Sequence, residues 1–145
     1  MDDAIYPYVR KFFAEEIPFN RYVGLEILKL EKGTATVKLP FRPELVGDPF
    51  RPALHGGAIA TLLDTTGGAA VWTELTPTDR VSTVDIRVDY LRPGRLEELH
   101  AEGCVRRVGN RMGVVAIRAY HPSHPDETIA EAMAVYNIRR ENDAR

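Results

Sequence analysis

The sequence lacks the features of several specialised protein classes. It has one cysteine, Cys104, so no intrachain disulfide can form, which fits a reducing compartment. Its 19 basic and 21 acidic residues are intermixed and give a net charge of −2, so the basic footprint of a nucleic-acid-binding protein is missing. The N-terminus, Met1-Asp2-Asp3, has no basic region followed by an apolar run, so we expect no signal peptide and a cytoplasmic location.

The composition instead fits one ordinary globular domain over residues 1–145, with 44% hydrophobic and 28% charged residues. Apolar residues at helical spacing predict a short helix over 4–16, which Pro18 should end. The proline-rich stretch 40–54 is expected to be an ordered loop. Alternating and β-branched runs predict strands at 22–30, 34–39, 81–92, 97–108, 111–121 and 128–139.

The most informative stretch is 55–72, a mostly apolar run with a single carboxylate, Asp64, at its centre. An ionised carboxylate is costly to bury unless it is paired or used, and its presence here also argues against a membrane span. The run opens with His55-Gly56-Gly57, which predicts a helix over about 55–73 whose first N–H groups can bind an anion. The order of elements predicts an α+β fold in which a curved antiparallel sheet wraps around this one long helix.

The spacing within this helix predicts an active site shared between two subunits. Gly57 and Asp64 are seven residues apart, so they share a helix face but lie about 10 Å apart along the axis. Two such helices lying antiparallel across a two-fold interface would bring Asp64 of one subunit to the helix start of the other. Such a site suits ester or thioester hydrolysis, because the Gly56 and Gly57 amides would stabilise an oxyanion and Asp64 would serve as base or nucleophile.

Two motifs carry a family resemblance. His55-Gly56-Gly57 followed by Leu63-Asp64, and then the run Thr83-Val84-Asp85-Ile86-Arg87-Val88-Asp89-Tyr90-Leu91-Arg92-Pro93, resemble the hotdog-fold acyl-CoA thioesterases over about residues 20–140. The resemblance is strongest to the phenylacetyl-CoA thioesterase-like branch, related to the 4-hydroxybenzoyl-CoA thioesterases. It implies hydrolysis of an acyl-CoA, no cofactor beyond the coenzyme A of the substrate, and a homodimer that completes the site, usually within a dimer of dimers (a homotetramer).

The resemblance also implies roles for single residues. The first glycine of the motif, which polarises the thioester carbonyl, maps onto Gly56, and the helix Asp that acts as base or nucleophile maps onto Asp64. The hydroxyl residue that places the water maps onto Thr83, with Ser82 beside it as a competitor. Relatives often carry an Asn before His-Gly-Gly. Asp48 is the nearest candidate here, and its carboxylate is not an amide donor.

Further polar residues are candidates for binding the substrate. Arg107, Asn110 and Arg111 surround a predicted turn, where they would either hold coenzyme A phosphates or form a solvated hairpin tip. Asp85 and Tyr90, in the motif after Thr83, are candidate substrate contacts, although Tyr90 falls on the apolar face of its strand and is favoured as core.

The other candidates have structural interpretations. His55 is favoured as a positioning residue over an acid or base. His121 and His124 lack further ligands nearby, so we expect no metal site, and Cys104 is expected to be a packing residue. Two rival functions stay open: a hotdog dehydratase or hydratase acting on acyl groups, and a non-catalytic acyl-CoA sensor or binding module.

Overall fold

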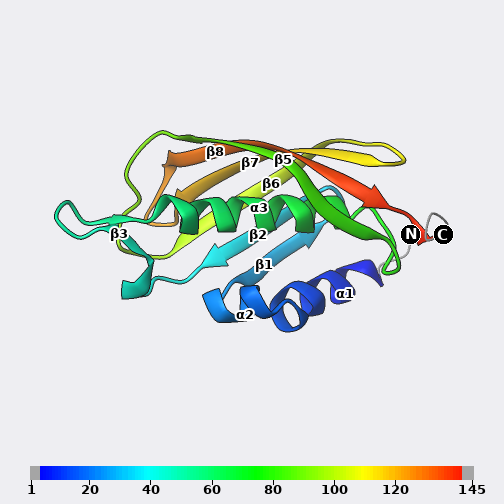
Figure 1. Ribbon diagram of the computed structural model, residues 1–145, viewed down its shortest axis with the longest axis horizontal. Coiled ribbons are helices and arrows are strands. Elements are labelled where there is room, and N and C mark those ends of the chain that lie inside the picture. Colours follow the sequence, from blue (N-terminus) through cyan, green and yellow to red (C-terminus); the bar gives the residue numbers. More distant parts are fainter. Residues whose placement is uncertain (1–3, 142–145) are drawn as a thin grey trace.

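A six-stranded antiparallel sheet wraps around one long helix, α3 (Gly56–Trp72), in the computed structural model, which describes residues 4–141 (Figure 1). The strand order is β1-β2-β6-β7-β8-β5. The strands are β1 (Glu26–Glu31), β2 (Thr34–Leu39), β5 (Arg80–Tyr90), β6 (Leu99–Val108), β7 (Met112–His121) and β8 (His124–Arg139). The predicted α+β architecture with a central helix is therefore confirmed.

The N-terminal segment differs from its prediction. The helix expected over 4–16 is present as α1 (Ile5–Lys11) followed by a π-helical turn, η1 (Phe12–Glu16). Pro18 ends this segment but also begins another helix, α2 (Pro18–Val23), because proline is well suited to the first helical position. Gly24 closes α2 with a φ of +86°, so the strand predicted from residue 22 starts only at Glu26.

The proline-rich stretch forms more structure than the expected loop. It contains a 3₁₀ turn, η2 (Pro43–Leu45), and a small hairpin of β3 (Val46–Asp48) and β4 (Ala53–Leu54). This hairpin packs against the start of α3, since a Cβ at Gly47 would lie 2.6 Å from His55 Cα. The hairpin therefore fixes the position at which α3 begins.

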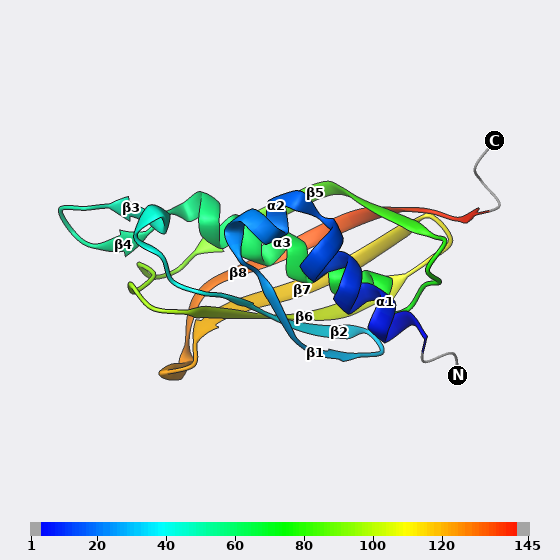
Figure 2. The same ribbon diagram turned by 90° about the horizontal axis from the view of Figure 1, so that it is seen from below.

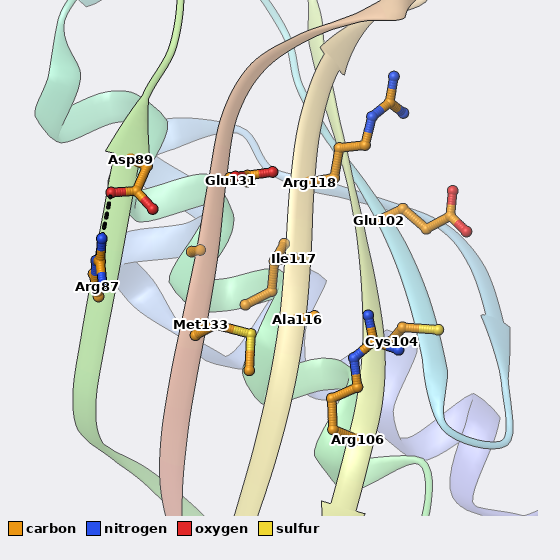
Figure 3. A pocket seen from close by; sticks show the side chains of 11 residues that line it. Arg87, Asp89, Glu102, Cys104, Arg106, Ala116, Ile117, Arg118, Glu131 and Met133 are labelled. Carbon is orange, nitrogen blue, oxygen red and sulfur yellow. Dashed lines mark hydrogen bonds and ion pairs between the residues drawn. The ribbon is translucent and has the colours of Figure 1, made fainter.

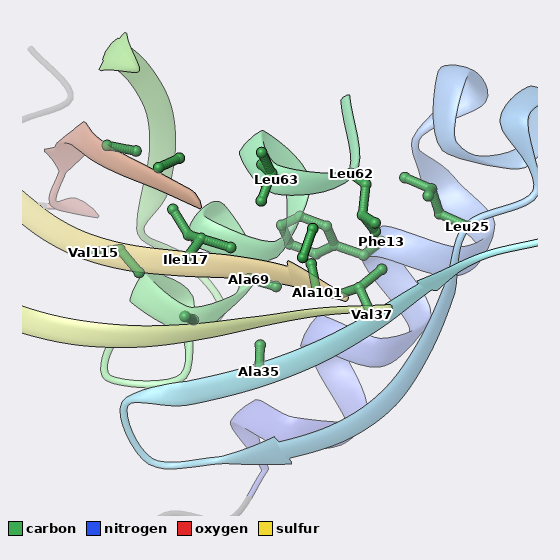
Figure 4. Close-up of a cluster of buried hydrophobic side chains, with 14 of the residues drawn as sticks. Phe13, Leu25, Ala35, Val37, Leu62, Leu63, Ala69, Ala101, Val115 and Ile117 are labelled. Carbon is green, nitrogen blue, oxygen red and sulfur yellow. The ribbon is translucent and has the colours of Figure 1, made fainter. Parts of the chain in front are cut away.

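The core lies between α3 and the concave face of the sheet, where apolar side chains from both layers meet (Figure 4). Glycines on the sheet permit close approach to the helix: a Cβ at Gly113 would lie 3.0 Å from Val71, and one at Gly103 3.3 Å from Thr66. The N-terminal helices lie along the flank of α3 (Figure 2), where Phe12 and Phe13 pack edge-on against Trp72.

Strand β5 departs from the simple alternation predicted for it. A register shift between Thr83 and Asp85 turns Thr83 toward α3, although the alternation placed it on the opposite face. The expectation that Tyr90 is a core residue is wrong: its side chain is 52% exposed, because β5 is an edge strand and Tyr90 lies at its end beside the start of α3.

Candidate active site

Asp64 lies in the middle of α3 and is held from the sheet by two hydroxyl groups. Its Oδ1 accepts a hydrogen bond of 2.7 Å from Thr83 Oγ1 and one of 3.3 Å from the Tyr136 hydroxyl. Within residues 4–141, no cation lies within ion-pair distance of this carboxylate, and Oδ2 accepts no hydrogen bond. One oxygen is thus fixed and the other is available to a ligand.

Tyr136 is a site residue that the sequence interpretation missed. Its side chain is fully buried, and its hydroxyl donates to the Asp64 main-chain carbonyl at 2.7 Å. Burial, followed by the negative charge of Asp64, raises the pKa of Tyr136 well above its ordinary value of 10.0, so the phenol remains a neutral donor. The available signal was the Gly67-Gly68 pair in α3, which leaves room for a large side chain from a distant strand.

The start of α3 presents one open amide. His55 is the N-cap: its Nδ1 accepts from the Gly57 N–H at 2.8 Å, and its carbonyl accepts from the N–H groups of Ala58 and Ile59. The Gly57 amide, considered above as an oxyanion donor, is therefore already used inside the helix cap. The Gly56 N–H has no hydrogen-bond partner in the described chain, which leaves it as the donor available at this end.

Asp64 and Gly56 line different cavities of the same chain, as the spacing predicted. Asp64 borders a cavity of about 280 Å³ whose other walls are mainly aromatic and aliphatic, among them Phe12, Ile17 and Trp72. Gly56 borders a separate hollow of about 300 Å³ beside Tyr90, whose hydroxyl donates to the Gly56 carbonyl at 2.9 Å. Neither cavity holds both the carboxylate and the open amide.

Two other predicted binding residues, Asp48 and Asp85, do not line the Asp64 cavity. Asp48 Oδ1 accepts from the N–H groups of Phe50 and Arg51, so it stabilises its own turn. Asp85 is exposed and does not line the Asp64 cavity. Their proposed contacts with substrate stay predictions.

The arginines at the β6–β7 hairpin also lie outside the Asp64 cavity. Arg107, Asn110 and Arg111 are all exposed. The hairpin packs near the C-terminal end of α3, since Gly113 abuts Val71, about 10 Å along the helix axis from Asp64. Their assignment to coenzyme A phosphates remains a prediction.

A hollow of about 530 Å³ lies on the outer face of the sheet, opposite α3 (Figure 3). It is lined by charged and small side chains, including the Arg87–Asp89 ion pair of 3.4 Å. Cys104 lines it and is exposed, so the expectation that it packs in the interior is wrong: it points outward from β6 between two core-facing neighbours. The hollow shares no lining residue with the Asp64 cavity.

The histidines of the β7–β8 turn serve the fold. His121 is buried, with Nε2 accepting from the Arg95 N–H at 2.9 Å and Nδ1 bonded to the Glu98 carbonyl at 2.8 Å.

Across residues 4–141 no group of three or more His, Cys, Asp or Glu side chains is arranged to hold a metal ion. In the same part of the chain, no helix has the length and apolarity needed to cross a membrane.

The chain is similar to known proteins in sequence and in fold. YigI of Escherichia coli K12, named a medium/long-chain acyl-CoA thioesterase, is 35% identical over 145 residues, covering 90% of this chain and 91% of YigI. A thioesterase family protein of Silicibacter pomeroyi superposes with a TM-score of 0.86 at 25% identity, over 94% of this chain and 98% of that one. PaaI of E. coli, from the phenylacetic acid degradation operon, shares the fold with a TM-score of 0.81 at 20% identity, over 94% and 93% of the two chains.

A family model matches the segment of the chain that contains the candidate site residues. The family model described as Thioesterase superfamily matches residues 52–128, which include the His55 cap, Asp64 and Thr83. The expected hotdog fold is thereby confirmed, and the chain belongs to the thioesterase superfamily.

Proposed function

We propose that this protein hydrolyses acyl-CoA thioesters at a site made by two subunits. The observation that carries the proposal is the Asp64 carboxylate, with Oδ1 bound by two hydroxyls and Oδ2 open, at the edge of an apolar cavity. The relationship to YigI, a protein named for acyl-CoA thioesterase activity, supports this choice of substrate.

In the proposed mechanism, Asp64 of one subunit works with the Gly56 N–H of the other. The thioester carbonyl oxygen accepts a hydrogen bond from the Gly56 amide, where the positive end of the helix dipole stabilises the developing oxyanion. Asp64 Oδ2 either removes a proton from the attacking water or attacks the carbonyl carbon itself. The carbon–sulfur bond then breaks, and coenzyme A leaves as the thiol after taking up a proton. In the first route the free acid forms directly. In the second route water hydrolyses the acyl–Asp64 anhydride, which releases the free acid and restores the carboxylate.

The apolar cavity beside Asp64 is the proposed site of the acyl group. Phe12, Phe13 and Trp72 give it aromatic walls, and its volume of about 280 Å³ is near the lower end for small-molecule pockets. Both a medium-length aliphatic chain and a single aromatic ring are suited to such walls. A charged acyl terminus would be disfavoured, because no cation lines the cavity to offset the loss of its hydration.

Release of free thiol from a panel of acyl-CoAs tests this proposal. The panel compares phenylacetyl-, benzoyl-, hydroxybenzoyl- and fatty acyl-CoA side by side. Asp64→Asn and Asp64→Ala should abolish turnover and leave the oligomer intact, whereas the matched control Asp126→Asn, at an exposed carboxylate on β8, should behave as wild type.

The same assay separates the rival functions. Full activity in either Asp64 variant contradicts the mechanism, and binding of acyl-CoA without thiol release favours a sensor. Loss of the alkene of crotonyl-CoA without release of thiol favours a hydratase.

A further inference from the structure

The two hydroxyl groups on Asp64 come from one position of the sheet. Thr83 and Tyr136 lie directly opposite each other in the β5–β8 register, and the irregularity after Thr83 turns its side chain toward α3. Both hydroxyls reach the same carboxylate oxygen, Oδ1. The family resemblance accounts for Thr83 but gives no role to Tyr136.

The Tyr136 hydroxyl contacts the backbone of α3. It donates to the Asp64 carbonyl at 2.7 Å, and α3 runs as an unbroken helix from Gly56 to Trp72. A carbonyl oxygen has two lone pairs, so the Asp64 carbonyl can accept from the phenol as well as from a helical N–H.

Gly67 is the residue that makes this close approach possible. A Cβ at this position would lie 2.1 Å from the Tyr136 hydroxyl oxygen and 2.9 Å from the adjoining ring carbon, which no side chain permits. At Gly68, by contrast, a Cβ would meet the ring at 3.6 Å, an ordinary contact. The first glycine of the pair is therefore required by the phenol, and the second is not.

We infer that Tyr136 is a positioning residue for Asp64, a role that rests on the proposed function. A phenol has a single proton, and here it is shared between the Asp64 carbonyl at 2.7 Å and Oδ1 at 3.3 Å. The one hydroxyl thus fixes both the main chain and the carboxylate of Asp64. Oδ1 is turned to the sheet, and Oδ2 is directed into the cavity where water and the thioester carbonyl carbon would meet.

Kinetics of Tyr136→Phe test this inference, because the variant keeps the buried ring and removes only the hydroxyl. We expect kcat to fall about 10-fold, the order of one hydrogen bond to a charged group, with KM changed less than about twofold. A fall in kcat with little change in KM is the result that a role in stability alone would not produce.

Two further variants complete the experiment. Tyr120→Phe is the matched control, since Tyr120 lies on the neighbouring strand β7 with its ring against His100 and Arg118, and it should leave kcat and KM unchanged. Gly67→Ala keeps the hydroxyl but displaces it, and should lower kcat in the same direction as Tyr136→Phe. If Tyr136→Phe does not fold, the kcat of Gly67→Ala tests the positioning role in its place.

The outcomes distinguish this inference from the proposed function. If Asp64→Asn is inactive while folded Tyr136→Phe, or Gly67→Ala in its place, keeps the wild-type kcat, the positioning role is refuted and the function stands. A loss of thermal stability in Tyr136→Phe with unchanged kinetics also refutes it, because the phenol would then serve the fold alone. If Asp64→Asn keeps full activity, the proposed function itself fails.

Discussion

Mixing two inactive variants tests whether the active site is shared between subunits. Asp64→Asn removes the base, and Gly56→Pro removes the amide hydrogen that has no partner at the start of α3. Proline is tolerated at the first helical position, and His55, with φ −63° and ψ 132°, already has the backbone that a residue before proline prefers. Gly56→Pro should therefore fold, and should lose about 100- to 1,000-fold in kcat as an oxyanion donor disappears.

The activity expected to return when the two variants are mixed follows from the geometry of α3. Asp64 lies eight residues beyond Gly56, about 12 Å along the helix axis, so one thioester carbonyl cannot contact both in the same chain. In a two-fold dimer with antiparallel helices, each site joins Asp64 of one subunit to Gly56 of the other. Equal amounts of the two variants give half mixed dimers, each with one intact site, so activity should recover to about a quarter of wild type.

Free thiol release is the assay, applied to co-expressed variants that carry different affinity tags. Each parent variant alone is the control for residual activity, and purification through both tags in succession enriches the mixed dimer. In that fraction about half of the wild-type activity is expected, because one of its two sites is complete.

Absence of recovery in the doubly purified fraction would refute the reasoning, because a site built within one chain leaves the mixed dimer with no intact centre. A protein that sediments as a monomer at the assay concentration and is fully active would refute it as well.

Two further predictions concern stability and are checked by denaturant unfolding. Gly68→Ala should stabilise the protein by about 1 kcal/mol, because alanine has the higher helix propensity. Gly67→Ala should destabilise it by about 1–3 kcal/mol. The overpacking against Tyr136 and the lost hydrogen bond there exceed the gain in helix propensity. Burial disfavours ionised Asp79, but hydrogen bonds from Thr76 and the Glu141 N–H outweigh it and hold its pKa below the ordinary 3.8. The stability from Asp79 is therefore complete above about pH 4 and lost as the pH falls through its folded-state pKa, and Asp79→Asn should flatten this acid dependence.

The architecture could be predicted because it depends on local patterns. An apolar run opened by His55-Gly56-Gly57 gave the central helix within one residue at each end, and alternating runs gave the strands of the main sheet. The irregularity in strand β5 was missed. The irregularity between Thr83 and Asp85 reverses the face of Thr83, and no period-two pattern reveals it.

The candidate site could be predicted only in part, because some of its residues stand out in the sequence and others do not. Asp64 is conspicuous because a lone carboxylate is unusual within an apolar helix, and Gly56 because the His55-Gly56-Gly57 start leaves N–H groups free to bind an anion. The His55–Gly57 cap and the Asp48 turn could not be assigned, because they depend on which acceptor each amide finds in three dimensions. Tyr136 was missed because 72 residues separate it from Asp64, and a strand tyrosine by itself indicates only a half-buried position.

The distribution of hydrogen bonds explains why the proposed site needs groups from two chains. The cap at His55 uses the Gly57 amide and leaves Gly56 open, while the sheet binds Oδ1 of Asp64 and leaves Oδ2 open. Each open group lies beside a different cavity, and the rigid helix between them keeps them about 12 Å apart. A donor and a base that the helix itself holds apart can act on one carbonyl group only if a second helix supplies the other member, so the chemistry proposed here requires assembly.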